Sequence, residues 1–372
     1  MRIGFPLPPV HKLEDGIRIG NMEFGLNFFP SCSPDEKSAT SYWANALDLC
    51  SLMDELSYTH VRTVEHYFHP YGGYSPNPIV FLAAAAQRSA KAKMITGAVL
   101  PVFNNPLKVA GELGMLDAIS NGRLEIGFAR AFLPSEFDTF GIDIEESRAR
   151  YEEGVEQIRL LLEETDVSHE GNFRSFKNVT SLPRPTQKPR PPFWVAAMSS
   201  KESFEFAARN GHYIMGIPMG GGTMAELIGV YREEWKKAGH PGNGKIMLSF
   251  SMHVGNDGAT ARDVFRGPLN AYLARLSDAA SGWLNGASTK DYKGYDKMVA
   301  SLKEDNFDEQ LARGICWAGS PDEVTEMVAE YDRQVGGFDI ASLHVMPHIT
   351  PMDVAERSMR LFSEKVMPKF QN

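Results

Sequence analysis

The sequence predicts an α/β protein, specifically a (β/α)8 TIM barrel with insertions after the fourth helix and before the eighth strand. From Met22 onward, short apolar runs alternate with segments of helical periodicity, as in a parallel sheet covered by helices. Eight such runs can be counted, which is the number of strands in this barrel. The predicted strands are residues 23–29, 60–65, 94–100, 124–128, 193–197, 213–217, 247–254 and 340–346.

The first strand and helix show the pattern most clearly. Phe24, Leu26 and Phe28 alternate with less apolar neighbours, which is the period of a strand with two unlike faces. A stripe of apolar residues at helical spacing then runs from Leu49 to Leu56. An open doubly wound sheet is the alternative fold, but no GxGxxG motif follows the first strand, so its dinucleotide-binding version loses its main support.

Two segments interrupt the repeat. Residues 165–192 are rich in proline, lysine and arginine and should form an excursion between the fourth helix and the fifth strand. Residues 277–317 are longer and polar, and connections of this length are either lids or disordered stretches. We expect a lid, because the segment carries aromatic residues with which it could close: Trp283, Tyr292, Tyr295 and Trp317.

Composition indicates a protein with a large core and excludes several partners. The chain has 372 residues, 43% hydrophobic, and we expect one domain at 22–372 after an N-terminal extension, 1–21, with Met22 as an alternative start. A net charge of -9 argues against nucleic acid and anionic membrane partners. No apolar run approaches the ~18 residues of a membrane span, and the extension lacks a signal-peptide core. Three distant cysteines give neither a disulfide framework nor a metal site, so we expect a cytoplasmic protein.

Polar residues that follow the strands are the candidates for chemistry, because the carboxyl ends of barrel strands form the active site. His66 follows the second strand and Arg130 the fourth, while Met198, Ser199 and Ser200 follow the fifth. Two hydroxyls at a helix start opposite an arginine would suit a phosphate group. Taken singly, each has an ordinary alternative: a structural histidine, a surface or ion-paired arginine, and a simple helix N-cap.

The order of short motifs closely resembles the bacterial luciferase family. The resemblance covers residues 22 to 370 and rests on these segments: Glu65-His66-Tyr67-Phe68, Asn77-Pro78, Leu100-Pro101, Asn105-Pro106, Leu116-Asp117, Ser120-Asn121-Gly122-Arg123, Gly127 with Arg130, Lys293-Gly294-Tyr295-Asp296, Gly319-Ser320-Pro321-Asp322-Glu323, Met359-Arg360-Leu361-Phe362 and Val366-Met367-Pro368. Each segment alone is weak evidence, but the ordered set is specific.

The resemblance implies a two-component flavin-dependent monooxygenase. Such an enzyme takes reduced FMN, held without a covalent bond, from a separate flavin reductase. It reacts the flavin with O2 to a C4a-hydroperoxide and passes one oxygen atom to a substrate. Family members are commonly dimers, so we expect a homodimer.

The resemblance also assigns site residues. His66 corresponds to the catalytic histidine and Arg130 to the phosphate-binding arginine, with Ser199 or Ser200 as further phosphate contacts. Thr96-Gly97 falls where the family has a non-proline cis peptide under the flavin ring. Ala129 and Met198 border the same cofactor site, and residues 293–296 correspond to the mobile active-site loop.

Two departures from the family pattern concern the substrate. Tyr67 replaces a second histidine and Ala129 a reactive cysteine, which puts light emission and a long-chain aldehyde substrate in doubt. Aromatic side chains near the second and fourth strands suggest an apolar or aromatic small molecule, in a pocket that we assign to Tyr67, Phe68, Phe132 and Asn104. Hydroxylation and Baeyer-Villiger insertion both stay open.

Other functions remain as alternatives on the same barrel, because fold alone does not settle the reaction. One is a flavin- or deazaflavin-dependent dehydrogenase. Another is a non-catalytic flavin-binding homologue or the inert partner of a heterodimer. For Glu65, beside His66, we expect a structural ion pair and no direct dyad with the histidine, since neighbouring strand residues face opposite sides.

Overall fold

The computed structural model describes residues 21–285, 292 and 294–371. Eight strands form its barrel: β1 (Glu23–Phe28), β2 (His60–Thr63), β3 (Lys93–Thr96), β4 (Leu124–Phe128), β7 (Phe193–Ala197), β8 (Tyr213–Gly216), β9 (Ile246–Val254) and β11 (Ile340–His344). Every neighbouring pair is parallel, and β11 pairs with both β9 and β1, so the sheet closes on itself. The predicted TIM barrel is confirmed, and each predicted segment overlaps one of its strands.

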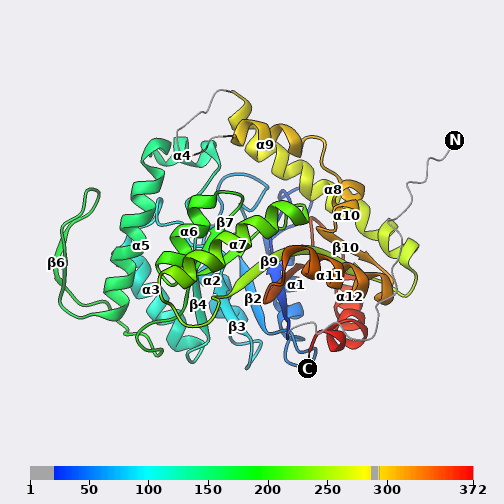
Figure 1. The fold of residues 1–372 in the computed structure, drawn as a ribbon, viewed down its shortest axis with the longest axis horizontal. Coiled ribbons are helices and arrows are strands. Elements are labelled where there is room, and N and C mark those ends of the chain that lie inside the picture. The colour runs from blue at the N-terminus through cyan, green and yellow to red at the C-terminus, as the bar shows by residue number, and fades with distance from the viewer. Residues whose placement is uncertain (1–20, 286–291, 293, 372) are drawn as a thin grey trace.

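Helices surround the barrel (Figure 1). Their bounds are α1 (Ala39–Cys50), α2 (Pro78–Ala85), α3 (Pro106–Ile119), α4 (Pro134–Phe140), α5 (Ser147–Glu163), α6 (Lys201–Arg209), α7 (Gly221–Lys237), α8 (Gly258–Ala279), α9 (Tyr295–Leu302), α10 (Phe307–Ala312), α11 (Pro321–Val335) and α12 (Met352–Lys365). The two Asn-Pro motifs begin α2 and α3. In each, the asparagine oxygen accepts the backbone N–H two residues on, and the proline takes the first helical position.

The stripe from Leu49 to Leu56 is helical only at its beginning. Helix α1 ends at Cys50, and from there backbone hydrogen bonds span three residues, as between the N–H of Leu52 and the carbonyl of Leu49 at 3.2 Å. The apolar spacing therefore continues through tight turns. Met53 is still fully buried beneath them.

One strand of the main sheet is missing from the prediction. Strand β10 (Cys316–Gly319) pairs with the second half of β9, from Ser251 to Val254, beyond the last residue of β9 that pairs with β8. Its sequence, Cys-Trp-Ala-Gly, is fully buried, so it lacks the alternation that marks a strand with one exposed face. The predicted polar segment 277–317 therefore includes its first two residues.

The first predicted excursion is a separate hairpin. Strands β5 (Val167–His169) and β6 (Phe176–Val179) pair antiparallel in a two-stranded sheet of their own. In Figure 1 this hairpin projects from the side of the barrel next to α5. None of its residues lines the cavity described below.

Alternating residues of β1 face different environments. Phe24 packs edge-on against Phe362 of α12, and Phe28 against Phe81 of α2, so the apolar residues of the strand contact the helices. The residues between them face the barrel interior, where a Cβ on Gly25 would collide with the ring of His60. Inside the barrel, a separate apolar cluster joins five strands: Ile95, Trp194, Met215, Met247 and Ile340.

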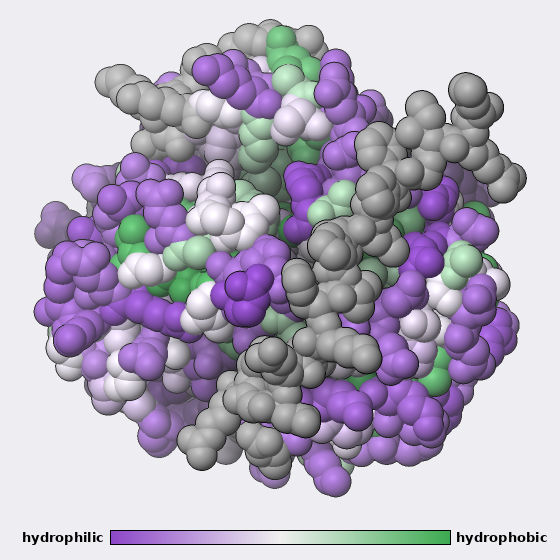
Figure 2. Space-filling view, turned by 45° about the vertical axis from the view of Figure 1, so that its right-hand side comes forward, coloured by the Kyte–Doolittle hydropathy of each residue, from purple (hydrophilic) through white to green (hydrophobic). Residues whose placement is uncertain are grey.

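Hydrophilic side chains dominate the face drawn in Figure 2, and hydrophobic ones gather in small separate areas. Within the described ranges, no helix is long and apolar enough to cross a membrane. The same residues contain no cluster of histidine, cysteine and acidic side chains that could hold a metal ion.

Candidate active site

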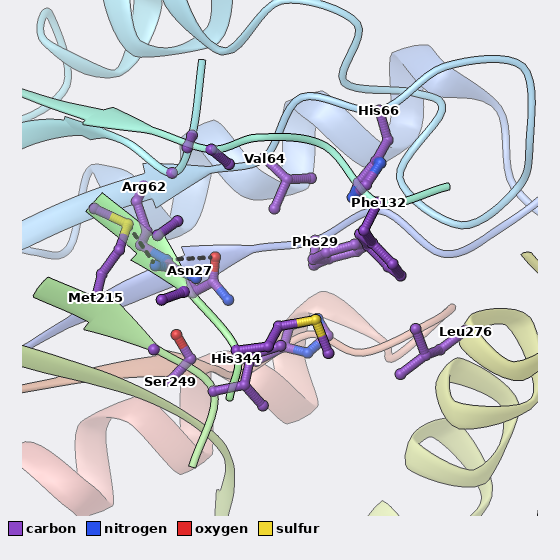
Figure 3. A pocket seen from close by; sticks show the side chains of 18 of the residues that line it. Asn27, Phe29, Arg62, Val64, His66, Phe132, Met215, Ser249, Leu276 and His344 are labelled. Atoms are coloured by element: carbon purple, nitrogen blue, oxygen red, sulfur yellow. Dashed lines mark hydrogen bonds between the residues drawn. The ribbon is translucent and has the colours of Figure 1, made fainter. Parts of the chain in front are cut away.

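A cavity of about 230 Å³ opens among the carboxyl ends of the barrel strands. Residues that follow β3, β4, β7 and β8 line its walls, and α8 contributes Tyr272, Leu273 and Leu276. Side chains from inside the barrel, including Asn27, Arg62 and Ser249, form its floor (Figure 3). This is where a barrel of this class carries its active site.

His66 lies in the cavity wall and is held by a buried carboxylate. Its Nδ1 is 3.0 Å from Oε1 of Glu136, which is 1% exposed and also accepts the backbone N–H of Tyr67 at 2.8 Å. The imidazole packs among three aromatic rings, those of Phe29, Tyr71 and Phe132. A carboxylate at Nδ1 favours the tautomer with its proton there, which leaves Nε2 as the acceptor.

Glu136 was missed by the sequence analysis. It lies in the first turn of α4, 70 positions from His66, and only the fold brings the two together. A carboxylate in the helix that follows β4 and Arg130 is the one available signal. It is weak, because acidic residues are common in first turns.

Glu65 points away from His66, as alternation along the strand predicts. Its carboxylate accepts hydrogen bonds from the Tyr67 hydroxyl, from Asn104 Nδ2 at 2.6 Å and from the Leu100 backbone N–H at 3.1 Å. No cation within the described residues pairs with it, so the expected ion pair is wrong. Burial raises the pKa of Glu65 to about 7, against the opposite effect of these donors.

Three of the four predicted pocket residues do not line the cavity. The side chains of Tyr67 and Asn104 donate hydrogen bonds to Glu65 and do not reach the cavity. Phe68 has a left-handed backbone, φ 61°, which turns its ring outward against Phe140, and it is 67% exposed. Phe132 does line the cavity, beside His66.

Positive charge and a helix start meet at another part of the wall. Arg130 lines the cavity with its guanidinium 4.1 Å from the ring centre of Tyr292. Ser200, the N-cap of α6, also lines it, whereas Ser199 is exposed and does not. The pKa of Glu202, in the first turn of α6, is lowered by its own backbone N–H and the Ser200 hydroxyl, and then by Arg148 and Arg130. A negative charge is therefore stabilised here.

The predicted cofactor segment after β3 is displaced by one residue. The cis peptide joins Gly97 to Ala98, not Thr96 to Gly97. Thr96 is the last residue of β3 and does not line the cavity, because its hydroxyl is bonded to the backbone of Gly127. Gly97 lines it, as do Ala129 and Met198, the other predicted neighbours of the cofactor.

The described part of segment 277–317, which we predict to be a lid, contacts the wall of the cavity. Trp283 donates to the carbonyl of Phe132 at 2.8 Å, and Tyr292 donates to the carbonyl of Ala131 at 2.9 Å. Tyr295 lines the cavity itself. Trp317 is not part of the lid, because it lies in β10 and stacks on Phe250. Residues 286–291 of this segment, and Lys293 of the predicted mobile loop, lie outside the described residues.

The model of one protein family, described as luciferase-like monooxygenase, matches residues 22–337. The chain belongs to this family. The oxygenase component of a flavin-dependent trigonelline monooxygenase from Acinetobacter baylyi is 31% identical, over 94% of this chain and 96% of that protein. An alkanal monooxygenase alpha chain from Photorhabdus luminescens is 26% identical, over 93% and 96%.

Solved structures agree with the luciferase-like assignment. The crystal structure of monooxygenase RslO1 from Streptomyces bottropensis has 41% identity and a TM-score of 0.84, and covers 94% of this chain and 100% of that one. At 21% identity and a TM-score of 0.78, the oxygenating constituent of 3,6-diketocamphane monooxygenase from Pseudomonas putida, in complex with FMN, shares the fold over 94% and 98%. An F420-dependent secondary alcohol dehydrogenase also shares the barrel, at 16% identity and a TM-score of 0.69, over 95% and 100%. Together the relatives support a flavin-dependent oxidoreductase of the monooxygenase kind.

Proposed function

We propose that this chain is the oxygenase component of a two-component monooxygenase. It takes reduced FMN from a separate flavin reductase in the cytoplasm and uses O2 to insert one oxygen atom into an apolar or aromatic small molecule. The observation that carries the proposal is the buried His66–Glu136 pair in the wall of a cavity that also holds an anion-stabilising helix start. Residues 22–372 act as one unit in this proposal, with 1–21 as an extension.

The residues around the cavity fit FMN at both of its ends. Arg130 and the N-terminus of α6 at Ser200 suit the phosphate, which would take the place that the Glu202 carboxylate now holds. Gly97 has no side chain, so it offers bare backbone for a flat ring. It also packs closely on Arg62, because a Cβ at this position would lie 3.2 Å from the Arg62 side chain. Ala129 and Met198 border the same space.

Reduced flavin, when bound, supplies two electrons and the reactive centre at which O2 is activated. One oxygen atom would then join the substrate and the other would leave as water, with both electrons and one proton coming from the anionic reduced flavin and the second proton from solvent. His66 Nε2 would accept or return a proton at the cavity wall, while Glu136 keeps the ring oriented. The rings of Phe29, Tyr71 and Phe132 exclude water around it.

The apolar lining favours a substrate that is itself apolar or aromatic. Leu273, Leu276 and Tyr272 of α8 line the cavity. Hydroxylation and Baeyer-Villiger insertion use the same two electrons and one O2. The position of a carbonyl group in the substrate would decide between them.

Binding of the cofactor can be tested without a substrate. We expect Arg130→Ala to weaken the affinity for reduced FMN by about 10- to 100-fold, because a charged hydrogen-bond partner of the phosphate is lost. Ser199→Ala is the control, since Ser199 lies outside the cavity. Anaerobic titration of both variants measures the effect, and equal affinities for Arg130→Ala and wild type would contradict the phosphate site.

A further inference from the structure

Arg62 is a buried cation on the floor of the cavity. It lies in β2, is 7% exposed and reaches into the barrel, and Figure 3 shows it among Asn27, Met215 and Ser249. Because an arginine side chain loses its hydration on burial, a position of this kind normally includes a carboxylate partner. The surroundings of Arg62 are therefore informative.

The contacts of Arg62 leave its charge without compensation. Nε donates to Asn27 Oδ1 at 3.1 Å, and Nη1 lies 3.4 Å from the sulfur of Met215 and 4.0 Å from that of Met247. Thioether sulfurs are weak acceptors. Within the described residues no carboxylate forms an ion pair with Arg62. Burial lowers its pKa to about 10, so the group is still charged at neutral pH.

Other polar atoms on the floor also lack partners. The hydroxyl of Ser249 and Nε2 of His344 are buried without a hydrogen-bond partner in the described part of the chain, and both residues line the cavity. Burial, together with the nearby charge of Arg62, lowers the pKa of His344 to about 3, so this imidazole is neutral at neutral pH. Buried polar groups in native proteins are almost always paired, which indicates a bound group that would complete this floor.

We propose that Arg62 and Asn27 form a subsite for a delocalised anionic oxygen of the bound ligand. The Nη2 of Arg62 and the amide nitrogen of Asn27 would be its donors, and neither has a hydrogen bond to another described residue. This subsite is separate from the phosphate site at Arg130. It rests on the proposed function, since it completes the same cavity.

Two chemical groups could present a delocalised anionic oxygen to this subsite. The first is the ring of reduced flavin, whose negative charge at neutral pH is shared between ring nitrogen and carbonyl oxygen. The second is an acid group on the organic substrate. The position of Gly97 favours the flavin, because a Cβ there would lie 3.2–3.3 Å from Cδ, Cβ and Nε of Arg62, directly beneath the segment proposed to support the ring.

The decisive measurement compares oxidised with reduced FMN. Oxidised flavin has a neutral ring and the same phosphate, so the ratio of the two dissociation constants isolates the ring charge. We expect Arg62→Met to reduce the preference for reduced FMN by about 10- to 100-fold. Arg62→Lys should retain part of it. Arg130→Met is the matched control, because loss of a phosphate contact weakens both forms equally and leaves the ratio unchanged.

A second variant and a second probe keep the proposal open to refutation. Asn27→Asp should reduce the preference while the protein stays folded, because the new carboxylate would neutralise Arg62 in place. Benzoate and neutral benzamide, titrated into the wild type and Arg62→Met, test for a substrate acid group. Selective loss of benzoate binding with an unchanged flavin ratio assigns the subsite to the substrate.

An unchanged flavin ratio together with unchanged benzoate binding would overturn the subsite altogether. A wild-type protein that binds neither form of FMN would instead contradict the proposed function. In that case the benzoate comparison alone decides whether the subsite exists, so the two failures are distinguishable.

Discussion

His66 is the side chain on which the proposed chemistry depends most, and its orientation depends on Glu136. We expect His66→Ala to lower product formation by about 100-fold or more, because positioned acid-base groups contribute about 10²- to 10⁴-fold to rate. The affinity for reduced FMN should change little, since His66 contacts neither Arg130 nor Ser200. Coupled turnover and anaerobic titration measure the two effects.

Glu136→Gln provides the matched variant for this prediction. The amide keeps the shape of the carboxylate but no longer requires a proton on His66 Nδ1, so turnover should fall in the same direction. The double variant should be no worse than His66→Ala alone, since the two residues act as a unit. Turnover of His66→Ala at the wild-type rate would show that the histidine is structural.

Glu65 should give the protein a specific dependence of stability on pH. Its pKa is raised by burial from 4.5 to about 7, so the folded protein retains a proton that the unfolded chain releases in this range. The contribution of Glu65 to the free energy of unfolding is thus fully present below pH 4.5 and is lost as pH rises to about 7. Above that it stays low.

Glu65→Gln removes this titration. The free energy of unfolding of Glu65→Gln, relative to that of wild type, should rise by up to about 3 kcal/mol between pH 4.5 and 7. Above pH 7 the difference should stay constant. Denaturant unfolding at a series of pH values measures the difference. Glu164→Gln, on the exposed end of α5, is the control. A constant difference between Glu65→Gln and wild type would mean that Glu65 is ionised throughout.

Single residues could be predicted where they follow a strand directly. His66, Arg130 and Ser200 all do, and all line the cavity. Glu136 and Arg62 could not be predicted, for different reasons. Glu136 meets His66 only through the fold, whereas Arg62 sits inside a strand where its direction depends on the register.

Among the elements, short fully buried segments were the hardest to predict. Strand β10 has no alternation and only four residues, so its polar surroundings dominated the prediction. Residues 97–100 are predicted as the end of a strand, yet β3 ends at Thr96 and only an isolated bridge between Val99 and Phe128 continues the pairing. Apolar composition indicates burial in such segments but does not distinguish a strand from a buried loop.

Helices α2 and α3 present an exposed apolar face that supports the proposed homodimer. Val80 on α2 is 69% exposed and Met115 on α3 is 58% exposed, with Leu107 and Ile119 nearby on α3. Exposed apolar side chains that gather on neighbouring helices mark association surfaces. Homodimers of this kind bury such a face around a twofold axis.

The mass in solution tests this interface. Wild type should elute at twice the mass of the chain, and the double variant Val80→Glu, Met115→Glu as a folded monomer, because two buried charges face each other across a twofold axis. Val264→Glu on α8 is the control, a similar exposed valine on another surface. A dimer in the double variant would place the interface elsewhere.

The fold of the whole molecule was predictable because eight repeats of strand and helix admit few arrangements. Closure between β11 and β1 then places every strand end around one cavity, and this brings His66, Arg130 and Ser200 together. The two deviations, β10 and the β5–β6 hairpin, leave the barrel intact. Most of the aromatic and polar side chains assigned to the substrate pocket were predicted wrongly, since their positions depend on backbone directions after the strands, as at Phe68.

The central claim is that this protein holds reduced flavin and activates O2 on it away from water. The most direct test mixes the anaerobic complex of protein and reduced FMN with oxygenated buffer and follows O2 and flavin absorbance together. We predict that O2 is consumed in a first step and that oxidised flavin appears in a second, slower step. Loss of O2 and appearance of oxidised flavin in one step, at the rate of free reduced FMN, would contradict the account.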